Sequence, residues 1–258
     1  MPRTILILAA IAALFYVALC LALLLAQRSF IYYPQPKSAG DDGPMLTLDV
    51  DGERLLVSTR ANTGPGAVIY FGGNAENVSH SLPTLAQAFP ERSVFAMNYR
   101  GYGGSTGKPS ESGLIADALA LFDRVHVDHP QIIVIGRSLG SGVAIHIASE
   151  RPVERLVLVT PYDSLLTIAA GQFGFFPLRW LMLDKFESWR YAPKITSPTR
   201  LIAAQNDEVI SYASTKSLYD RFRPFVASMT LIPGVGHNSI SESPQYISAI
   251  GGNSTGGP

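Results

Sequence analysis

The fold is decided by residues 132–140, which read IIVIGRSLG. The apolar run Ile132–Ile135 predicts a buried strand, and a helical pattern begins directly after the segment. Between them stands G-x-S-x-G, with Ser138 at its centre, in the place of a strand-to-helix turn. Gly136 and Gly140 lack side chains, so strand and helix can approach closely around a strained serine. We therefore predict that Ser138 presents its hydroxyl at the carboxyl end of a sheet, above a helix N-terminus.

Short apolar runs alternate with longer helix-like stretches from residue 45 onwards. Strands are expected at 45–50, 54–59, 67–71, 93–97, 132–135, 156–159, 200–204 and 228–232, and helices at 79–89, 112–127, 139–149 and 212–222. The first two strands are separated by Asp51-Gly52, a strong hairpin-turn signal. The alternation predicts an α/β fold with a mostly parallel, doubly wound sheet and an antiparallel hairpin at its start.

The N-terminal segment Ile5–Ala26 contains no charged residue, no Gly and no Pro. As a helix it would span about 33 Å at roughly 1.5 Å per residue, enough to cross a hydrocarbon core. A cleaved signal peptide is the alternative, but its apolar region is usually only about 7–15 residues and ends at a small-x-small site, where this chain has Leu24. We expect a retained transmembrane anchor over 4–27 that places the following domain on the non-cytoplasmic side of the membrane and takes no part in its chemistry.

The rest of the chain is predicted to form a juxtamembrane connector at 28–44, one domain at 45–250 and a disordered tail at 251–258. The connector contains Phe30, Tyr32 and Tyr33, aromatic residues that suit a membrane interface. The 20 Lys and Arg residues balance 20 Asp and Glu residues without a basic block, so nucleic acid is not an expected partner. Cys20 is the only cysteine, which excludes an intramolecular disulfide.

Nucleotide-binding patterns fail on the residues present. A G-x-G-x-x-G starting at Gly140 would have Ile145 in place of its third glycine. A P-loop ending at Gly107-Lys108 would have Tyr102 in place of its first glycine, and Pro109 where Ser or Thr should bind magnesium. We therefore expect neither a cofactor nor a metal.

Several segments together resemble the α/β-hydrolase superfamily, and most of all its small membrane-anchored serine hydrolases with an abhydrolase (serine-aminopeptidase-like) domain. The resemblance covers roughly residues 30–250. It rests on FGGNAEN at 71–77, NYRGYG at 98–103, GRSLG at 136–140, PYDSL at 161–165, NDEV at 206–209 and GHN at 236–238. It implies a serine hydrolase that cleaves an ester or thioester through a Ser-His-Asp triad and an acyl-enzyme.

The resemblance implies a triad of Ser138, His237 and Asp207. A serine hydroxyl needs a base to take its proton, and the pKa of histidine suits that role near neutrality. His237 follows the last predicted strand in a loop of small residues, and the family's order of serine, acid, histidine selects it. Asp207 follows the strand predicted at 200–204, as in the family. Asp163 is the rival acid, although its Pro-Tyr-Asp-Ser context favours a cap for the next helix.

The resemblance also implies an oxyanion hole made by the backbone N–H groups of Leu139 and Asn74. This chain departs from its relatives, which usually have His-Gly where it has Gly72-Gly73. The departure predicts a looser loop, but the backbone donors that do the chemistry remain.

Residues 160–199 are too few for a large cap domain, and their apolar segments 165–170, 173–176 and 180–183 predict a small collar over the site. An apolar rim next to a membrane suits a small-molecule or lipid-like acyl substrate. Two alternatives stay open, a non-catalytic binding module of the same fold and a serine peptidase.

Overall fold

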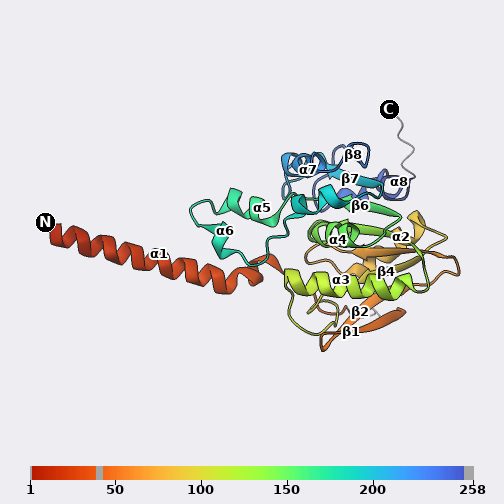
Figure 1. Ribbon diagram of the computed structural model, residues 1–258, viewed down its shortest axis with the longest axis horizontal. Helices are drawn as coiled ribbons and strands as arrows, with labels where there is room; N and C mark the ends of the chain where they lie inside the picture. Colours follow the sequence, from red (N-terminus) through yellow and green to blue (C-terminus); the bar gives the residue numbers. More distant parts are fainter. Residues whose placement is uncertain (1, 39–42, 253–258) are drawn as a thin grey trace.

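The computed structural model describes residues 2–38 and 43–252, and this part of the chain contains an eight-stranded sheet with the order β1-β2-β4-β3-β5-β6-β7-β8 (Figure 1). The strands are β1 (Met45–Val50), β2 (Glu53–Arg60), β3 (Gly66–Phe71), β4 (Ser93–Met97), β5 (Gln131–Arg137), β6 (Arg155–Val159), β7 (Thr199–Ala204) and β8 (Ala227–Ile232). The predicted α/β class is confirmed, and every predicted strand is present within two residues of its expected bounds.

The sheet begins with the predicted antiparallel hairpin of β1 and β2, in which Val50 faces Glu53. Asp51 and Gly52 both have positive φ, 50° and 79°, as the tightest hairpin turns require. β2 pairs antiparallel with β4, and every later pairing is parallel. The carboxyl ends of β3, β5, β7 and β8 therefore lie at one edge of the sheet, where the loops that follow them can meet.

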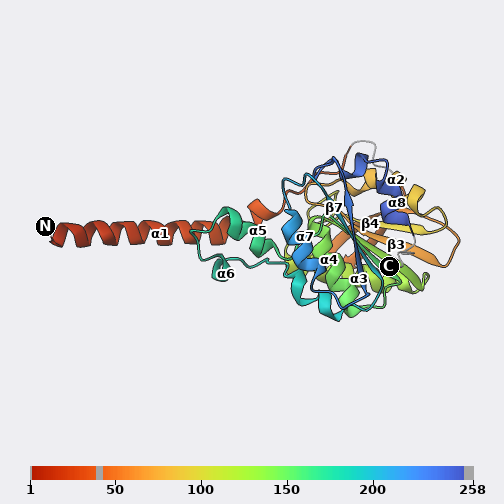
Figure 2. The ribbon, with the colours of Figure 1, turned by 90° about the horizontal axis from the view of Figure 1, so that it is seen from above.

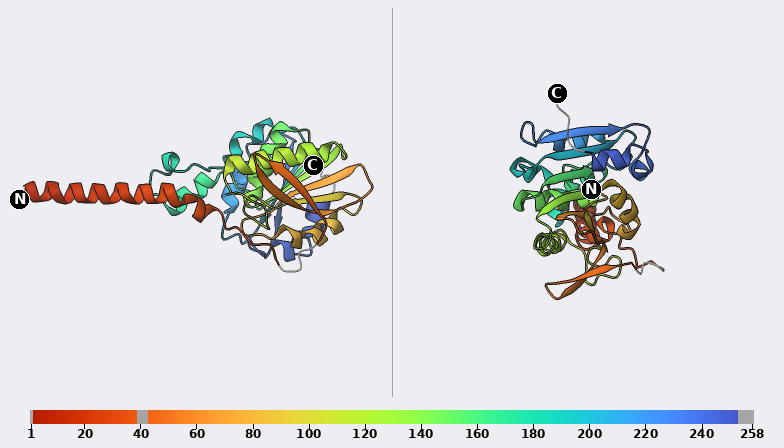
Figure 3. Two further views of the ribbon diagram at one scale, coloured as in Figure 1. Left: turned by 90° about the horizontal axis from the view of Figure 1, so that it is seen from below. Right: turned by 90° about the vertical axis from the view of Figure 1, so that its right-hand side faces the viewer.

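Helices cover both faces of the sheet (Figure 3). One apolar cluster joins the sheet to α3 (Glu111–His126), α4 (Leu139–Glu150) and α7 (Tyr212–Tyr219). A second cluster joins the other face to α2 (Leu82–Ala88) and α8 (Tyr246–Gly251). Short 3-10 helices are η1 (Val78–Ser81), η2 (Ser188–Arg190), η3 (Ala192–Lys194) and η4 (Ile240–Glu242). The strands are apolar on both faces of the sheet, so both faces must be covered by helices, which gives the three-layer arrangement.

Helix α1 (Pro2–Ile31) projects from the end of the domain, and α5 (Leu165–Gln172) and α6 (Leu178–Leu181) lie beside its C-terminal part (Figures 1 and 2). The predicted apolar helix is thus confirmed. By length and composition the part Arg3–Ile31 could cross a membrane, and its most apolar stretch is exposed. We call residues 165–184, which contain α5 and α6, the collar.

The predicted domain bounds need two corrections. The helix continues to Ile31 rather than ending at 27, and Tyr32 is not part of a free connector, because it is 3% exposed within the main apolar cluster. Burial raises the pKa of the Tyr32 hydroxyl, which therefore stays protonated and donates to Asp184. At the other end, Gly251 belongs to α8, not to a tail. Residues 39–42 of the predicted connector and 253–258 of the predicted tail lie outside the described residues.

Candidate active site

Ser138 stands between β5 and α4 in a strained backbone conformation, with φ 48° and ψ −117°. Its N–H donates to the Val159 carbonyl at 2.9 Å, which ties the turn to the neighbouring strand β6. The turn needs its glycines. A Cβ on Gly140 would lie 2.1 Å from the Phe71 carbonyl oxygen, and one on Gly136 would lie 2.4 Å from the Gly140 carbonyl oxygen. The chain thus presents the Ser138 hydroxyl at the edge of the sheet at the cost of local strain.

His237 and Asp207 meet Ser138 at this edge. His237 Nε2 lies 2.9 Å from Ser138 Oγ, and its Nδ1 lies 2.9 Å from Asp207 Oδ2 and 3.1 Å from Asp207 Oδ1. The side chains of His237 and Asp207 are 8% and 5% exposed. Asp207 Oδ1 also accepts the N–H groups of Val209 and Ile210, at 2.9 and 2.7 Å. A carboxylate held in this way fixes the tautomer with a proton on Nδ1, so that Nε2 can accept from Ser138.

Asp163, the rival acid, has other partners. Its Oδ1 accepts the Ser214 hydroxyl of α7 at 2.7 Å and the Ser164 N–H at 2.8 Å. The predicted cap of the following helix is Ser164 rather than Asp163, because the Ser164 hydroxyl accepts the Thr167 N–H. The structure therefore places Asp163 in a contact between α5 and α7.

The other four histidines lie elsewhere. His146 is within 2.8 Å of Glu150 on its own helix, and burial lowers its pKa. His126 stacks on Phe122, and His129 lies against Phe95 in a tilted arrangement. His80, in η1, lines a separate cavity next to α2.

The loop after β3 carries the predicted oxyanion donor Asn74. Asn74 lines the same cavity as Ser138 and Leu139. The Leu139 N–H is in the first turn of α4, where N–H groups have no helical acceptor. The Asn74 N–H donates to no protein group within the described residues. Both N–H groups are therefore free to receive a negative charge that develops beside Ser138.

This loop is fixed by two side chains, Glu76 and Tyr99, that carry no signal of such a role in the sequence. The Glu76 carboxylate accepts the Gly73 N–H at 2.6 Å, and the Tyr99 hydroxyl donates to the Gly72 carbonyl at 2.7 Å. A Cβ on Gly72 would lie only 2.6 Å from a methyl group of Val78, so a side chain at this position would require Val78 to shift. Hydrogen bonds from its neighbours hold the backbone in place.

The Asn74 side chain is also held at both ends. Its Oδ1 accepts the Tyr102 hydroxyl at 2.8 Å and the Tyr33 N–H at 2.9 Å, while its Nδ2 donates to the Ile31 carbonyl at 2.7 Å. Burial raises the pKa of Tyr102 to about 12, so its hydroxyl is a donor at neutral pH. The end of α1 thus helps to position the loop.

Glu208 is a second residue that sequence reasoning missed. Its Oε2 accepts the His237 N–H at 3.1 Å. It thereby ties the histidine loop to the loop that carries Asp207. Its only signal in the sequence is its position next to Asp207.

The chain is similar in sequence to several known proteins. A model of the alpha/beta hydrolase fold matches residues 66–188. An uncharacterised protein of Mycobacterium tuberculosis is 33% identical over 230 residues, which cover 82% of this chain and 80% of that protein. The chain belongs to the α/β-hydrolase family.

Two further proteins are similar to this α/β-hydrolase. The alpha/beta hydrolase domain-containing protein aho-3 of Caenorhabditis elegans is 34% identical over 161 residues, covering 61% of this chain and 47% of that protein. The structure of an esterase from Pyrococcus furiosus superposes with a TM-score of 0.65 at 20% identity, covering 85% of this chain and 97% of the esterase. At that identity the superposition shows the shared fold alone.

The cavity beside Ser138 has a volume of about 240 Å³ and a mostly apolar wall. The collar contributes Ile168, Ala169 and Met182, and the end of α1 contributes Phe30 and Ile31. Within residues 2–38 and 43–252, no charged side chain lines it. The last turn of α1 thus forms part of the wall of this cavity.

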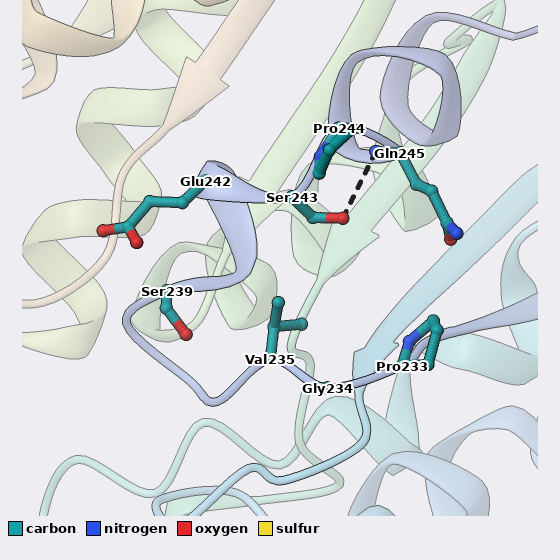
Figure 4. A pocket seen from close by; sticks show the side chains of 8 residues that line it. All are labelled: Pro233, Gly234, Val235, Ser239, Glu242, Ser243, Pro244 and Gln245. Carbon is teal, nitrogen blue, oxygen red and sulfur yellow. Dashed lines mark hydrogen bonds between the residues drawn. The ribbon is translucent and has the colours of Figure 1, made fainter.

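A larger hollow of about 480 Å³ lies beside the loop that follows β8 (Figure 4). It is lined by Pro233, Gly234, Val235, Ser239, Glu242, Ser243, Pro244 and Gln245. Figure 4 shows Glu242 and Gln245 pointing away from each other, and the bond drawn joins the Gln245 N–H to the Ser243 hydroxyl. None of the triad residues lines this hollow, so its size does not make it the site.

Over residues 2–38 and 43–252, the structure holds no cluster of three or more His, Cys, Asp or Glu residues that could bind a metal.

Proposed function

We propose that this α/β-hydrolase is a serine hydrolase that cleaves a carboxylic ester or thioester through Ser138, His237 and Asp207. The observation that carries the proposal is the chain of hydrogen bonds from Asp207 Oδ2 to His237 and from His237 to Ser138 Oγ, each 2.9 Å long. A nucleophile, a base and an orienting carboxylate at these distances are the parts that acyl transfer needs.

In the first half of the reaction, His237 Nε2 takes the proton of Ser138 Oγ as the oxygen attacks the acyl carbon. The carbonyl oxygen becomes an oxyanion that accepts the N–H groups of Leu139 and Asn74, and Asp207 stabilises the imidazolium. When the tetrahedral intermediate collapses, His237 gives its proton to the leaving alcohol or thiol, and the acyl group stays on Ser138. Water then attacks the acyl-enzyme with His237 again as the base, which releases the carboxylic acid and restores Ser138.

The wall of the cavity favours a small-molecule or lipid-like acyl substrate. Its only polar side chains besides the site residues are Gln172 and the hydroxyl of Tyr162, which donates to the Leu139 carbonyl. An exopeptidase would need a charged group to hold a peptide terminus, and none lines this cavity. We therefore favour ester or thioester cleavage over exopeptidase action, and a non-catalytic module of the same fold is the other alternative.

We test the function with 4-nitrophenyl butyrate and butyryl 4-nitroanilide, which carry the same acyl group, on the full chain in detergent micelles. The ester should be hydrolysed and the anilide left intact, because amides are the harder bond to cleave. Faster cleavage of the anilide would instead indicate a peptidase. Turnover of neither compound would indicate a binding module.

We further propose that α1 anchors the enzyme in a membrane, with the hydrolase domain on the non-cytoplasmic side. The length and apolar composition of Arg3–Ile31 support the anchor. The full chain should stay with the membrane pellet after carbonate or high-salt extraction, because burial of the apolar helix outweighs any electrostatic attachment that salt can screen. Release by carbonate, or a mature N-terminus near Gln27, would contradict the anchor.

A further inference from the structure

Helix α1 is attached to the collar by directional bonds as well as by apolar contact. The side-chain amide of Gln27, which is 9% exposed, donates to the Leu181 carbonyl at 3.0 Å and accepts the Leu183 N–H at 2.7 Å. Further along the helix, the Tyr16 ring stacks on Phe176 with 5.9 Å between ring centroids. A polar residue at the end of an apolar helix thus satisfies two backbone groups of the collar, and the two elements form one unit.

An ion pair strengthens the same attachment. Arg28 Nε lies 2.9 Å from Asp184 Oδ2, and the Asp184 side chain is only 4% exposed. The Tyr32 hydroxyl donates to the same oxygen at 3.2 Å. The Asp184 carboxylate is thus shielded from solvent and bound by two side chains, Arg28 at the end of α1 and Tyr32 just after it. These two bonds fix the distance between helix and collar.

A second cavity, of about 110 Å³, lies between α1 and the collar. Leu23 and Gln27 line it from the helix, and Leu178 and Leu181 line it from α6. It adjoins the cavity beside Ser138, and five residues line both: Phe30, Ile31, Ala169, Phe173 and Met182. Apart from Gln27, whose amide is bonded to the backbone, the wall of the second cavity is apolar.

We propose that this second cavity receives the acyl chain of the substrate whose carbonyl group lies at Ser138, so that α1 is one wall of the acyl-binding site. The inference rests on the proposed ester or thioester hydrolysis. We call the two adjoining cavities together the passage. The passage starts at the nucleophile, becomes more apolar with distance from it and ends against a helix that is apolar enough to lie in a membrane. An acyl chain that enters from the bilayer can therefore reach Ser138 along α1 without crossing water.

The test compares two pairs of neighbouring substitutions in the full chain, in detergent micelles. Ala169→Trp fills the passage from the collar, and its control is Ala170→Trp at the next, exposed position. Leu23→Trp fills it from the helix, and its control is Leu25→Trp, at a residue that is 85% exposed. For each protein we measure kcat/KM for 4-nitrophenyl decanoate and 4-nitrophenyl acetate, and we take the ratio of the two.

In the wild type kcat/KM should be higher for the decanoate than for the acetate, because each buried methylene group raises kcat/KM by up to about fourfold. Ala169→Trp and Leu23→Trp should each lower the ratio at least about tenfold, the loss expected from displacing only two methylene groups. Ala170→Trp and Leu25→Trp should stay within about twofold of the wild type, as surface changes do. Leu23 lies on a helix that is exposed along most of its length, so Leu23→Trp should fold even if Ala169→Trp does not. If Leu23→Trp keeps the wild-type ratio, the inference is overturned.

Failure of the proposed function gives a different result. If the wild type hydrolyses neither ester, the function is wrong, and photo-crosslinking with decanoic acid that carries a diazirine then tests the cavity alone. An acyl-chain site would be supported by crosslinks to residues 165–184 that are lost in Leu23→Trp and retained in Leu25→Trp. Equal crosslinking in the two variants would overturn it.

Discussion

Ser138→Ala should lower ester turnover by at least about 10³-fold, as removal of a catalytic serine does in other triad enzymes. Without the hydroxyl, His237 has no nucleophile to activate, and water must attack the substrate directly. The protein should remain folded, because the Ser138 side chain contacts His237 and makes no other hydrogen bond in the described residues. The measurement is kcat/KM for 4-nitrophenyl butyrate, together with a thermal melt.

Ser149→Ala is the matched control for this substitution. Ser149 lies in the same helix α4, and its hydroxyl donates to the His146 carbonyl one turn earlier, its one hydrogen bond in the part of the chain that the structure describes. Its replacement should leave turnover within about twofold of the wild type, as expected for a surface change. Normal turnover by Ser138→Ala would show that another group is the nucleophile.

Asp207→Asn should lower kcat/KM by up to about 10⁴-fold. An amide in place of the carboxylate can direct its NH₂ group at His237 Nδ1, which favours the tautomer with the proton on Nε2. That tautomer cannot accept the proton of Ser138. The two backbone N–H groups now bound to Asp207 Oδ1 can still bond to the amide oxygen, so the loop should keep its shape.

Asp163→Asn is the informative comparison, because it makes the same chemical change at the rival acid. The Asp163 carboxylate accepts from Ser214 and Ser164, and an amide oxygen can accept from both. We expect its kcat/KM to lie within about tenfold of the wild type, since it disturbs only the packing of α5 against α7. If Asp163→Asn is the more damaging of the two, the acid has been assigned to the wrong residue.

The sheet was predictable because its signals are local. Strands buried on both faces are continuous apolar runs, and Asp51-Gly52 marks the hairpin by its backbone preference alone. The same holds for Ser138, whose strand, glycines and helix are contiguous in the sequence. His237 and Asp207 lie far from it in the sequence, and their choice depended on the resemblance to a family. The structure brings all three together, while their catalytic roles stay predictions until they are measured.

The supporting contacts could not be predicted, because they join residues that are distant in sequence and ordinary in type. Glu76 and Glu208 look like any surface acid until the loops that they bond are in place. Tyr32 is an aromatic residue beside an apolar helix, a pattern that fits a membrane interface and a protein core equally well. Gln27 is a polar residue at the end of the apolar run, and only the collar shows what it bonds to.

The central claim is that Ser138 is the covalent nucleophile, and fluorophosphonate labelling tests it most directly. The full chain would be labelled in detergent micelles, digested, and mapped by peptide mass spectrometry. We predict one adduct, on the peptide that contains Ser138, which is absent from Ser138→Ala and present in Ser149→Ala. An adduct on a different serine, or no adduct on a protein that hydrolyses the ester, would contradict the claim.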